Sequence, residues 1–199
     1  MKKMVLASNN PGKVREFSAL LKEFDIEVLP QSAFGVPEAE ETGLTFVENA
    51  IIKARNACEH TGLPALADDS GIEVDALNGA PGIYSARYSG PGAGDEANNL
   101  KLLEALANVP DGERTARYVA LIVLMEHAGD PTPIICEGTW EGSILREERG
   151  EGGFGYDPLF WVPTHDRASA ELPPEEKNRI SHRGIALRKL IASLRGDPE

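Results

Sequence analysis

The sequence predicts an α/β fold with a mixed sheet, built as one continuous domain. Three observations lead to this prediction. Strand-like and helix-like patterns alternate in the first third of the chain, strand-like patterns cluster later, and the 199 residues are 41% hydrophobic and 26% charged. A chain of this length can bury one substantial core or two closely packed lobes. No internal repeat, low-complexity tract or linker interrupts it, so we expect a single domain over residues 1–199.

Apolar residues in the first 60 positions switch between short continuous runs and helical spacing. Thr45 and Glu48 have the spacing of a capping box, which predicts a helix start. The acidic segment before them reads as a loop. The expected elements are a strand at 3–7, a helix at 13–24, a strand at 26–29, a loop at 30–43 and a helix from 45 to about 60.

The rest of the chain is richer in extended segments. Ser181 is suited to N-cap a final helix, whose apolar residues form one buried stripe. Two long extended segments separated by a Gly-Asp-Pro turn look like a hairpin. The expected elements are extended segments at 63–67 and 72–77 around a turn at 68–71, a loop at 78–94, a helix at 95–107, a hairpin of 115–127 and 132–146, a strand at 159–162, a helical turn opened by 173–176 and the final helix.

Charge and composition exclude several classes of protein. The net charge of −12 argues against a nucleic-acid polymer as partner, because such binding depends on many Lys and Arg contacts to phosphates. No apolar run reaches the roughly 18 residues of a membrane span, and the N-terminus lacks a secretory h-region. We therefore expect a cytoplasmic protein with no membrane partner, in which Cys58 and Cys136 are buried, reduced thiols. A small phosphorylated ligand stays compatible with the charge.

A strand–turn–helix junction near the N-terminus has the composition of an anion site. Small polar residues, a Pro-Gly turn and a lysine precede the amphipathic helix pattern, and a helix N-terminus offers unpaired N–H groups to an anion. The P-loop signature is absent. The alternative is an ordinary turn with a surface lysine. The candidate residues are Ser8, Asn9, Asn10, Pro11, Gly12 and Lys13.

Two adjacent carboxylates, Asp68 and Asp69, follow an apolar strand pattern. Burying such a pair is costly unless a cation or hydrogen-bond donors compensate, and Mg²⁺ prefers hard oxygen ligands. One carboxylate can also orient or deprotonate an attacking water. The acidic residues Glu40 and Glu41 can supply a further ligand. The alternatives are a solvated turn at 68–71 and a solvated acidic loop at 40–41.

A glycine-rich segment, residues 152–158, places Phe154, Tyr156 and Asp157 just before a strand. Glycines such as Gly155 let the backbone approach a ligand, and an aromatic ring there can stack on a nucleobase. Asp157 can accept a hydrogen bond from the edge of the base. The alternative is a flexible turn whose aromatic residues belong to the core.

His182 and Arg183 occupy the first turn of the expected final helix. Cations at that end oppose the helix dipole, and such local conflicts often mark functional sites. Their donors can read the carbonyl oxygens of a base, although an exposed first turn is the alternative. Lys53 and Lys177 are further candidate cations, each of which can also be a surface lysine.

Together and in order, these segments resemble the inosine/xanthosine triphosphate pyrophosphatase family, the house-cleaning dITP/XTP pyrophosphatases. The resemblance covers nearly the whole chain, and it is the joint occurrence of the segments that is specific. They are SNNPGK at 8–13, EETGLTFVENA at 40–50, KA at 53–54, ADDSG at 67–71, GAPGIYSARYSG at 79–90, GGFGYDP at 152–158 and EEKNRISHRG at 175–184.

The resemblance implies an elongated fold whose two lobes flank a nucleotide-binding cleft, and a homodimer. It also implies Mg²⁺-dependent hydrolysis of a non-standard purine nucleoside triphosphate to the monophosphate and pyrophosphate. Asp69 would be the catalytic acid/base and a metal ligand. Asp68 would lie beside it, and Glu40, or Glu41, would complete the metal site. The residues implied to bind substrate are Ser8 to Lys13, Lys53 and Lys177 at the phosphates, Ser70, Phe154 to Asp157 at the base, and His182 and Arg183 at the purine oxygen.

Three rival functions are weaker. A Maf-like pyrophosphatase acting on pyrimidine nucleotides would lack the FGYD and SHR segments in this arrangement. A non-catalytic nucleotide sensor would not need Asp68 and Asp69 beside an anion. A kinase would be expected to carry the P-loop pattern, which is absent.

Overall fold

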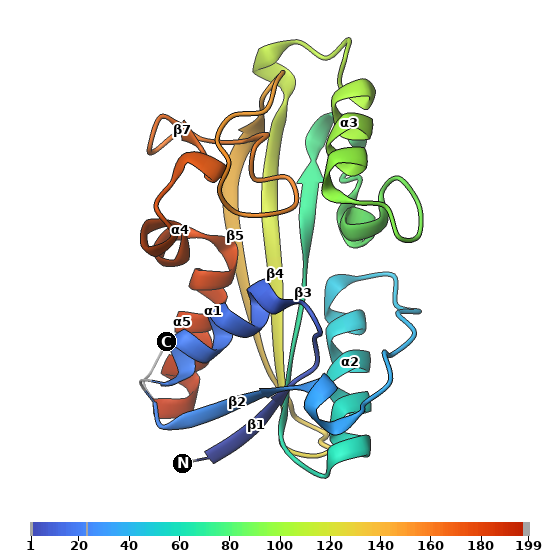
Figure 1. Cartoon of the computed structure of the whole chain (residues 1–199), viewed down its shortest axis with the longest axis vertical. Helices are drawn as coiled ribbons and strands as arrows, with labels where there is room; N and C mark the ends of the chain where they lie inside the picture. Colours follow the sequence, from blue (N-terminus) through green and yellow to red (C-terminus); the bar gives the residue numbers. More distant parts are fainter. Residues whose placement is uncertain (1, 23, 197–199) are drawn as a thin grey trace. The chain divides into compact units, whose positions relative to one another are not determined.

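The computed structural model describes residues 2–22 and 24–196 of the chain. Its strands form a seven-stranded mixed sheet in the order β2-β1-β3-β4-β5-β6-β7, which confirms the predicted fold class. The chain divides into two compact units (Figure 1). The first unit consists of Met1–Asp69, Ala120–Glu137 and Ala186–Glu199, and the second of Ser70–Val119 and Gly138–Ile185.

The first unit is built on parallel strands. β1 (Lys2–Leu6) pairs in parallel with β2 (Ile26–Pro30) and with the start of β3 (Ala65–Val74). Parallel neighbours require crossover connections, and helices supply them here. β1 is fully buried from Met4 onward, as expected for a strand covered on both faces.

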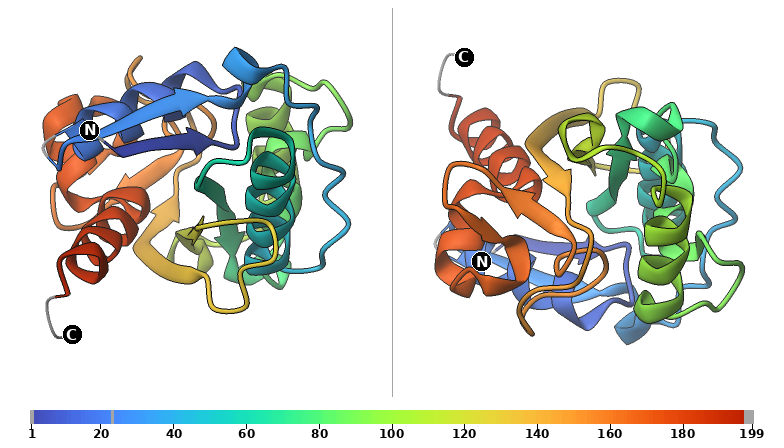
Figure 2. Two further views of the ribbon diagram at one scale, coloured as in Figure 1. Left: turned by 90° about the horizontal axis from the view of Figure 1, so that it is seen from below. Right: turned by 90° about the horizontal axis from the view of Figure 1, so that it is seen from above.

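Helices cover both faces of these strands. α1 (Pro11–Lys22) and the C-terminal part of α5 (His182–Arg195) contribute buried Phe17, Leu21, Leu187 and Leu190 to one apolar cluster. α2 (Phe46–Thr61) lies on the other side of the strands, where Figure 2 shows it apart from α1 and α5. The helical spacing read from the sequence therefore corresponds to real buried faces.

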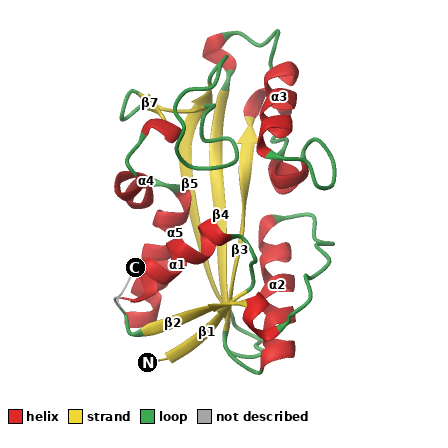
Figure 3. Ribbon diagram, viewed as in Figure 1, coloured by secondary structure: helices red, strands yellow, loops and turns green. Residues whose placement is uncertain are grey.

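The second unit has its own core. Apolar residues from β3 and the long strands β4 (Thr115–Met125) and β5 (Ile134–Ile144) pack with Leu102 and Leu106 beside them. α3 (Asp95–Ala105) and α4 (Pro174–Ile180) lie on opposite sides of these strands (Figure 3). β6 (Phe160–Val162) pairs antiparallel with β5 and with β7 (Arg167–Ala168), a short strand that the sequence does not predict.

The largest difference from the predicted elements lies at residues 68–71. The sequence predicts a turn between two extended segments, but β3 continues unbroken through Asp68, Asp69, Ser70 and Gly71. Both aspartates are buried, with 1% and 8% of their surface exposed. The alternative of a solvated turn is therefore wrong, and the polar run is a buried stretch of strand whose charges need partners inside the protein.

Other expectations agree closely with the structure. Thr45 caps α2 by accepting a hydrogen bond from the Glu48 amide, and Ser181 accepts one from Gly184 at the start of α5. Cys58 and Cys136 are both buried. None of the helices in the described ranges is long and apolar enough to cross a membrane.

Candidate active site

The loop before α1 is organised by its own polar side chains. The Ser8 hydroxyl oxygen accepts a hydrogen bond from the Asn10 amide at 3.1 Å, and Asn10 Oδ1 accepts two, from Gly12 at 2.9 Å and Lys13 at 3.2 Å. Asn10 therefore acts as the N-cap of α1. The prediction of unpaired N–H groups in this loop is wrong for these three amides, because side chains already satisfy them. Asn9 is exposed and its side-chain amide donates to Glu38, while Pro11 begins the helix.

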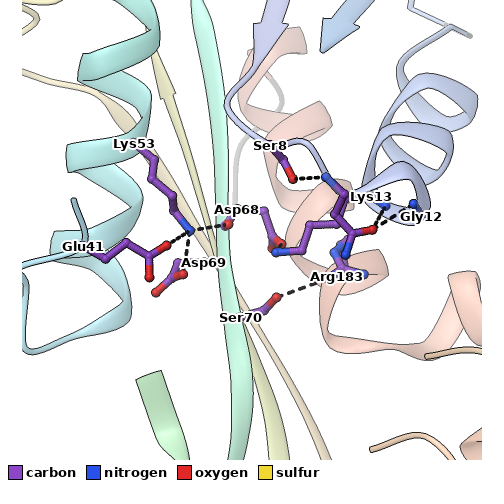
Figure 4. Close-up of polar contacts among 10 residues, drawn as sticks. Ser8, Gly12, Lys13, Glu41, Lys53, Asp68, Asp69, Ser70 and Arg183 are labelled. Atoms are coloured by element: carbon purple, nitrogen blue, oxygen red, sulfur yellow. Dashed lines mark hydrogen bonds and ion pairs between the residues drawn. The ribbon is translucent and has the colours of Figure 1, made fainter. Parts of the chain in front are cut away.

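The two adjacent aspartates do not form a pair on one side of the strand. Successive side chains of a strand point to opposite faces, and Figure 4 shows Asp68 and Asp69 leaving β3 in opposite directions. Asp68 Oδ2 lies 2.6 Å from the Lys13 ammonium, on the side of α1. Asp69 lies on the side of α2. The prediction that Asp68 shares a metal site with Asp69 is therefore not supported by the placement of their side chains.

Lys53, from α2, is held by three oxygens of the first unit (Figure 4). Its ammonium nitrogen lies 2.6 Å from Asp69 Oδ1, 3.2 Å from Glu41 Oε1 and 3.0 Å from the Asp68 carbonyl oxygen. We call these three atoms the oxygen nest. The Lys53 and Asp69 side chains are only 15% and 11% exposed. Removing one partner of such a buried ion pair typically costs about 3–5 kcal/mol.

Burial and charge act against each other in this pair. Burial lowers the pKa of Lys53, but the charges of Asp69 and Glu41 more than compensate, so this pKa lies above its ordinary value of 10.5. Burial raises the pKa of the Asp69 carboxyl above 3.8, and the Lys53 ammonium offsets only part of that rise. Asp69 is thus a carboxylate held in an environment that disfavours its charge, as is common for catalytic acids and bases.

The acidic loop contributes Glu41 rather than Glu40. Glu40 is exposed, whereas Glu41 reaches Lys53. The backbone just after Glu41 is fixed, because the Gly43 amide donates to Asn49 Oδ1 at 2.8 Å and the Leu44 amide donates to Glu48 Oε2 at 2.9 Å. The sequence named Glu40 first as a metal ligand and Glu41 as the alternative; of the two, Glu41 is the one that contacts Lys53 beside Asp69.

The side chains around Asp69 fit a divalent cation. Within the described residues, Asp69 Oδ2 is buried and has no hydrogen-bond partner, which is a costly arrangement for a carboxylate oxygen. Hard carboxylate and carbonyl oxygens are the ligands of Mg²⁺. No three His, Cys, Asp or Glu side chains converge as a ligand set within the described ranges. The oxygens that could hold the cation are those of Asp69, Glu41 and the Asp68 carbonyl.

In the second unit, Asp157 is the centre of a buried network. Its Oδ2 accepts hydrogen bonds from Lys177 at 2.6 Å and the Phe154 amide at 2.9 Å. Its Oδ1 accepts from Ser169 at 3.0 Å and the Tyr118 hydroxyl at 3.3 Å. Each oxygen of the carboxylate thus accepts two hydrogen bonds, so its hydrogen-bonding capacity is filled. Asp157 therefore ties the glycine-rich segment to β4 and α4, and its contact with a base stays a prediction.

The two aromatic residues of this segment have different surroundings. Phe154 is 37% exposed, and its ring lies 4.9 Å from the Lys177 ammonium and 5.8 Å from the Arg183 guanidinium. Tyr156 is buried and its hydroxyl donates to the Ser85 carbonyl at 2.6 Å. Phe154 thus offers a ring face to a base, whereas the Tyr156 side chain belongs to the core and the Gly155 amide donates to Asp95 Oδ2 at 2.7 Å.

His182 and Arg183 are buried, so the alternative of an exposed first turn is wrong. The His182 ring stacks on Tyr118, with centroids 4.6 Å apart and planes inclined by 9°. The Arg183 guanidinium donates to the Ser70 hydroxyl at 3.1 Å. The second unit therefore collects Phe154, Lys177, His182 and Arg183 with Ser70, as a set of donors and one exposed ring.

Sequence reasoning missed the residues that support this set. Tyr118 and Ser169 lie in segments with no motif, yet both bond to Asp157. Trp140 extends the stack of Tyr118 and His182. Alternation along β4 indicates that Tyr118 is an inward residue, but nothing in the sequence indicates that its hydroxyl reaches Asp157.

The fold and these two sets of residues define a class: an α/β protein with a buried, lysine-paired acid in one unit and an exposed aromatic ring among cations in the other. Residues 4–193 match the Ham1 family, and the chain belongs to that family. It is 64% identical to the dITP/XTP pyrophosphatase of Thioalkalivibrio sulfidiphilus (strain HL-EbGR7) over 98% of this chain and 99% of that protein.

Two further comparisons agree with this membership. The chain is 62% identical to the dITP/XTP pyrophosphatase of Vibrio parahaemolyticus serotype O3:K6, over 98% of this chain and 97% of that protein. The solved structure of a HAM1 protein from Coxiella burnetii is 55% identical and matches with a TM-score of 0.93, over 98% of this chain and all of that one.

Proposed function

We propose that this protein hydrolyses non-standard purine nucleoside triphosphates, dITP and XTP among them, to the nucleoside monophosphate and pyrophosphate. The observation that carries the proposal is the buried Asp69, whose Oδ2 has no hydrogen-bond partner among the described residues, in a chain whose relatives are named dITP/XTP pyrophosphatases. A water molecule attacks the α-phosphorus, its proton passes to Asp69, and the bond to the bridging oxygen of the β-phosphate breaks. Pyrophosphate leaves and the monophosphate remains.

Residues of the first unit act on the phosphates in this proposal. Lys13 and Lys53 bind phosphate oxygens, and the loop from Ser8 to Gly12 accepts an anion once the Asn10 side chain gives up its two amides. Asp69 and Glu41 would hold Mg²⁺. When bound, the cation supplies charge neutralisation and polarises the phosphoryl oxygens.

Residues of the second unit act on the base. Phe154 stacks on the purine and Lys177 adds a cation beside it. His182 and Arg183 donate hydrogen bonds to the carbonyl oxygen at the 6-position, which inosine and xanthosine carry. Adenine has an amino group there, so its binding would leave buried donors unpaired. Such a mismatch can produce selectivity of several orders of magnitude.

The test is a product assay with Mg²⁺ and single nucleotides. We expect dITP, ITP and XTP to give monophosphate and pyrophosphate, with dATP turned over at least 100-fold more slowly in kcat/KM. Chromatography of the products separates the possibilities. Orthophosphate released from dITP, equal turnover of dTTP, or binding without hydrolysis would each contradict the proposal and favour a different enzyme class or a sensor.

Two parts of the proposal come from family resemblance alone. We propose a homodimer, and a cytoplasmic location where the nucleotide pool is used. Removal of non-standard purine nucleotides from that pool would keep them out of DNA and RNA.

A further inference from the structure

Lys53 occupies a position that has the ligands of a metal ion. The oxygen nest surrounds its ammonium with one oxygen each from Asp69, Glu41 and the Asp68 carbonyl, at 2.6, 3.2 and 3.0 Å. These are hard oxygens, the kind that Mg²⁺ prefers. An ammonium ion carries one positive charge and can donate three hydrogen bonds, one to each oxygen.

We propose that the Lys53 ammonium occupies the position of the divalent cation in the free protein. There it binds the oxygen nest, and it leaves the nest when substrate and cation arrive. This inference rests on the proposed function, since a triphosphate is the new partner to which Lys53 moves. It assigns Lys53 a second role besides binding phosphate, which is to control access of the cation to Asp69.

Charge pairing explains why the exchange needs both ligands. If a cation alone displaced Lys53, the buried ammonium would lose its carboxylate partners, which is costly. If a triphosphate alone attracted Lys53, Asp69 and Glu41 would face phosphate oxygens with no counterion. When both bind, the carboxylates have the cation and the lysine has a phosphate. Binding of cation and binding of triphosphate therefore favour each other, and the coupling must be reciprocal.

The pair formed by Lys13 and Asp68 lies on the other side of β3 and is separate from the oxygen nest. Asp68 therefore has a counterion other than Lys53 in the free protein. The ion pairs that the entering cation has to break are the two that Lys53 forms with Asp69 and Glu41.

One substitution distinguishes this inference from a simple phosphate-binding role. Lys53→Met removes the ammonium and leaves Asp69 and Glu41 open to a cation. We expect the metal-free variant to bind Mn²⁺, used as a spectroscopic substitute for Mg²⁺, at least tenfold more tightly than the wild type, with free Mn²⁺ measured by electron paramagnetic resonance without nucleotide. Unchanged or weaker Mn²⁺ binding would overturn the inference.

A matched control accounts for the loss of one positive charge. Lys2 also belongs to the first unit, and its ammonium pairs with exposed Glu126 at 3.1 Å. Lys2→Met changes the net charge by the same amount but leaves the oxygen nest intact, so we expect wild-type Mn²⁺ binding. An equal gain in both variants would mean that general electrostatic attraction explains the effect, and the inference would fall.

The nucleotide-binding experiment uses a non-hydrolysable analogue, dITP with an imido bridge between the α- and β-phosphates. With saturating Mn²⁺, Lys53→Met should bind the analogue at least tenfold more weakly than the wild type, by isothermal titration calorimetry. Opposite changes for cation and nucleotide support the exchange, while loss of both would mean a purely structural lysine. If circular dichroism shows that Lys53→Met is unfolded, Lys53→Gln carries the same expectations and the same overturning results.

The two proposals fail in different ways. A wild type that does not hydrolyse dITP would defeat the proposed function, whatever the Mn²⁺ titrations show. A wild type that does hydrolyse dITP, together with a Lys53→Met variant whose Mn²⁺ affinity is unchanged, would defeat only this inference.

Discussion

At the scale of single residues, Asp69 shows what a buried carboxylate costs the protein. It is 8% exposed, its Oδ2 has no hydrogen-bond partner within the described residues, and burial raises its pKa despite Lys53. Burying a charge that is only partly compensated destabilises the fold. Proteins often accept such a cost at the site where the group acts.

This cost should appear in the pH dependence of stability. The pKa of Asp69 is higher in the folded protein than its ordinary 3.8, so between the two values the folded state binds a proton that the unfolded state does not. The contribution of Asp69 to the free energy of unfolding therefore increases as the pH falls through the pKa that Asp69 has in the folded protein. The increase is complete at about pH 3.8, the ordinary pKa of the group. Urea unfolding of metal-free wild type and Asp69→Asn at a series of pH values should show this component only in the wild type. An identical pH dependence in the two proteins would contradict it.

At the scale of elements, the sequence predicted most helices and strands because their apolar spacing is local. Thr45 with Glu48 and Ser181 also act as the predicted caps. The polar run at 68–71 misled the prediction, since a turn and a buried strand with internal counterions have the same local composition. The counterions Lys13 and Lys53 lie 55 and 16 residues away from their aspartates, and local patterns carry no information on such contacts.

For the candidate site as well, the sequence indicated some residues but not the contacts that other residues make. The motifs drew attention to Asp69, Lys53 and Arg183, but they did not indicate the buried contacts of Asp157 and Tyr156. A glycine-rich segment can expose its polar residues or bury them, and which of these occurs depends on donors from distant elements. For Asp157 these donors are Tyr118, Ser169 and Lys177.

The Asp157 network should be a structural unit that joins three elements. Asp157→Asn keeps the size of the side chain but removes the charge that pairs with Lys177, whose side chain is 11% exposed, and replaces one acceptor oxygen with a donor. We expect a loss of about 3–5 kcal/mol in the free energy of unfolding, as for other buried ion pairs. Asp75→Asn is the control, because Asp75 is an exposed acid of the same unit that pairs with Arg117 at 2.9 Å. Its effect should be much smaller. Both losses are measured by urea unfolding. Similar values would show that the Asp157 network contributes no more to stability than the exposed ion pair of Asp75 and Arg117.

At the scale of the whole molecule, the chain forms two units that each have their own core. In the proposed function, the first unit supplies the groups for phosphate chemistry and the second supplies those for base recognition. Asp69 and Ser70 are consecutive residues of β3, yet they belong to different units. The division predicts that turnover and selectivity can be changed independently.

Two substitutions test this division through the ratio of kcat/KM for dITP to that for dATP. Lys13→Ala, in the first unit, removes a phosphate contact that both nucleotides share, so both values should fall together and the ratio should stay the same. Arg183→Ala, in the second unit, removes a donor for the 6-carbonyl oxygen, which only dITP carries. The dITP value should fall at least tenfold while dATP changes little, since one hydrogen bond to a charged group typically contributes about 1.5–3 kcal/mol.

Exposed Arg167→Ala, also in the second unit, controls for loss of charge and should leave the ratio unchanged. A change of ratio in Lys13→Ala, or an unchanged ratio in folded Arg183→Ala, would show that phosphate chemistry and base recognition are not divided between the two units in this way.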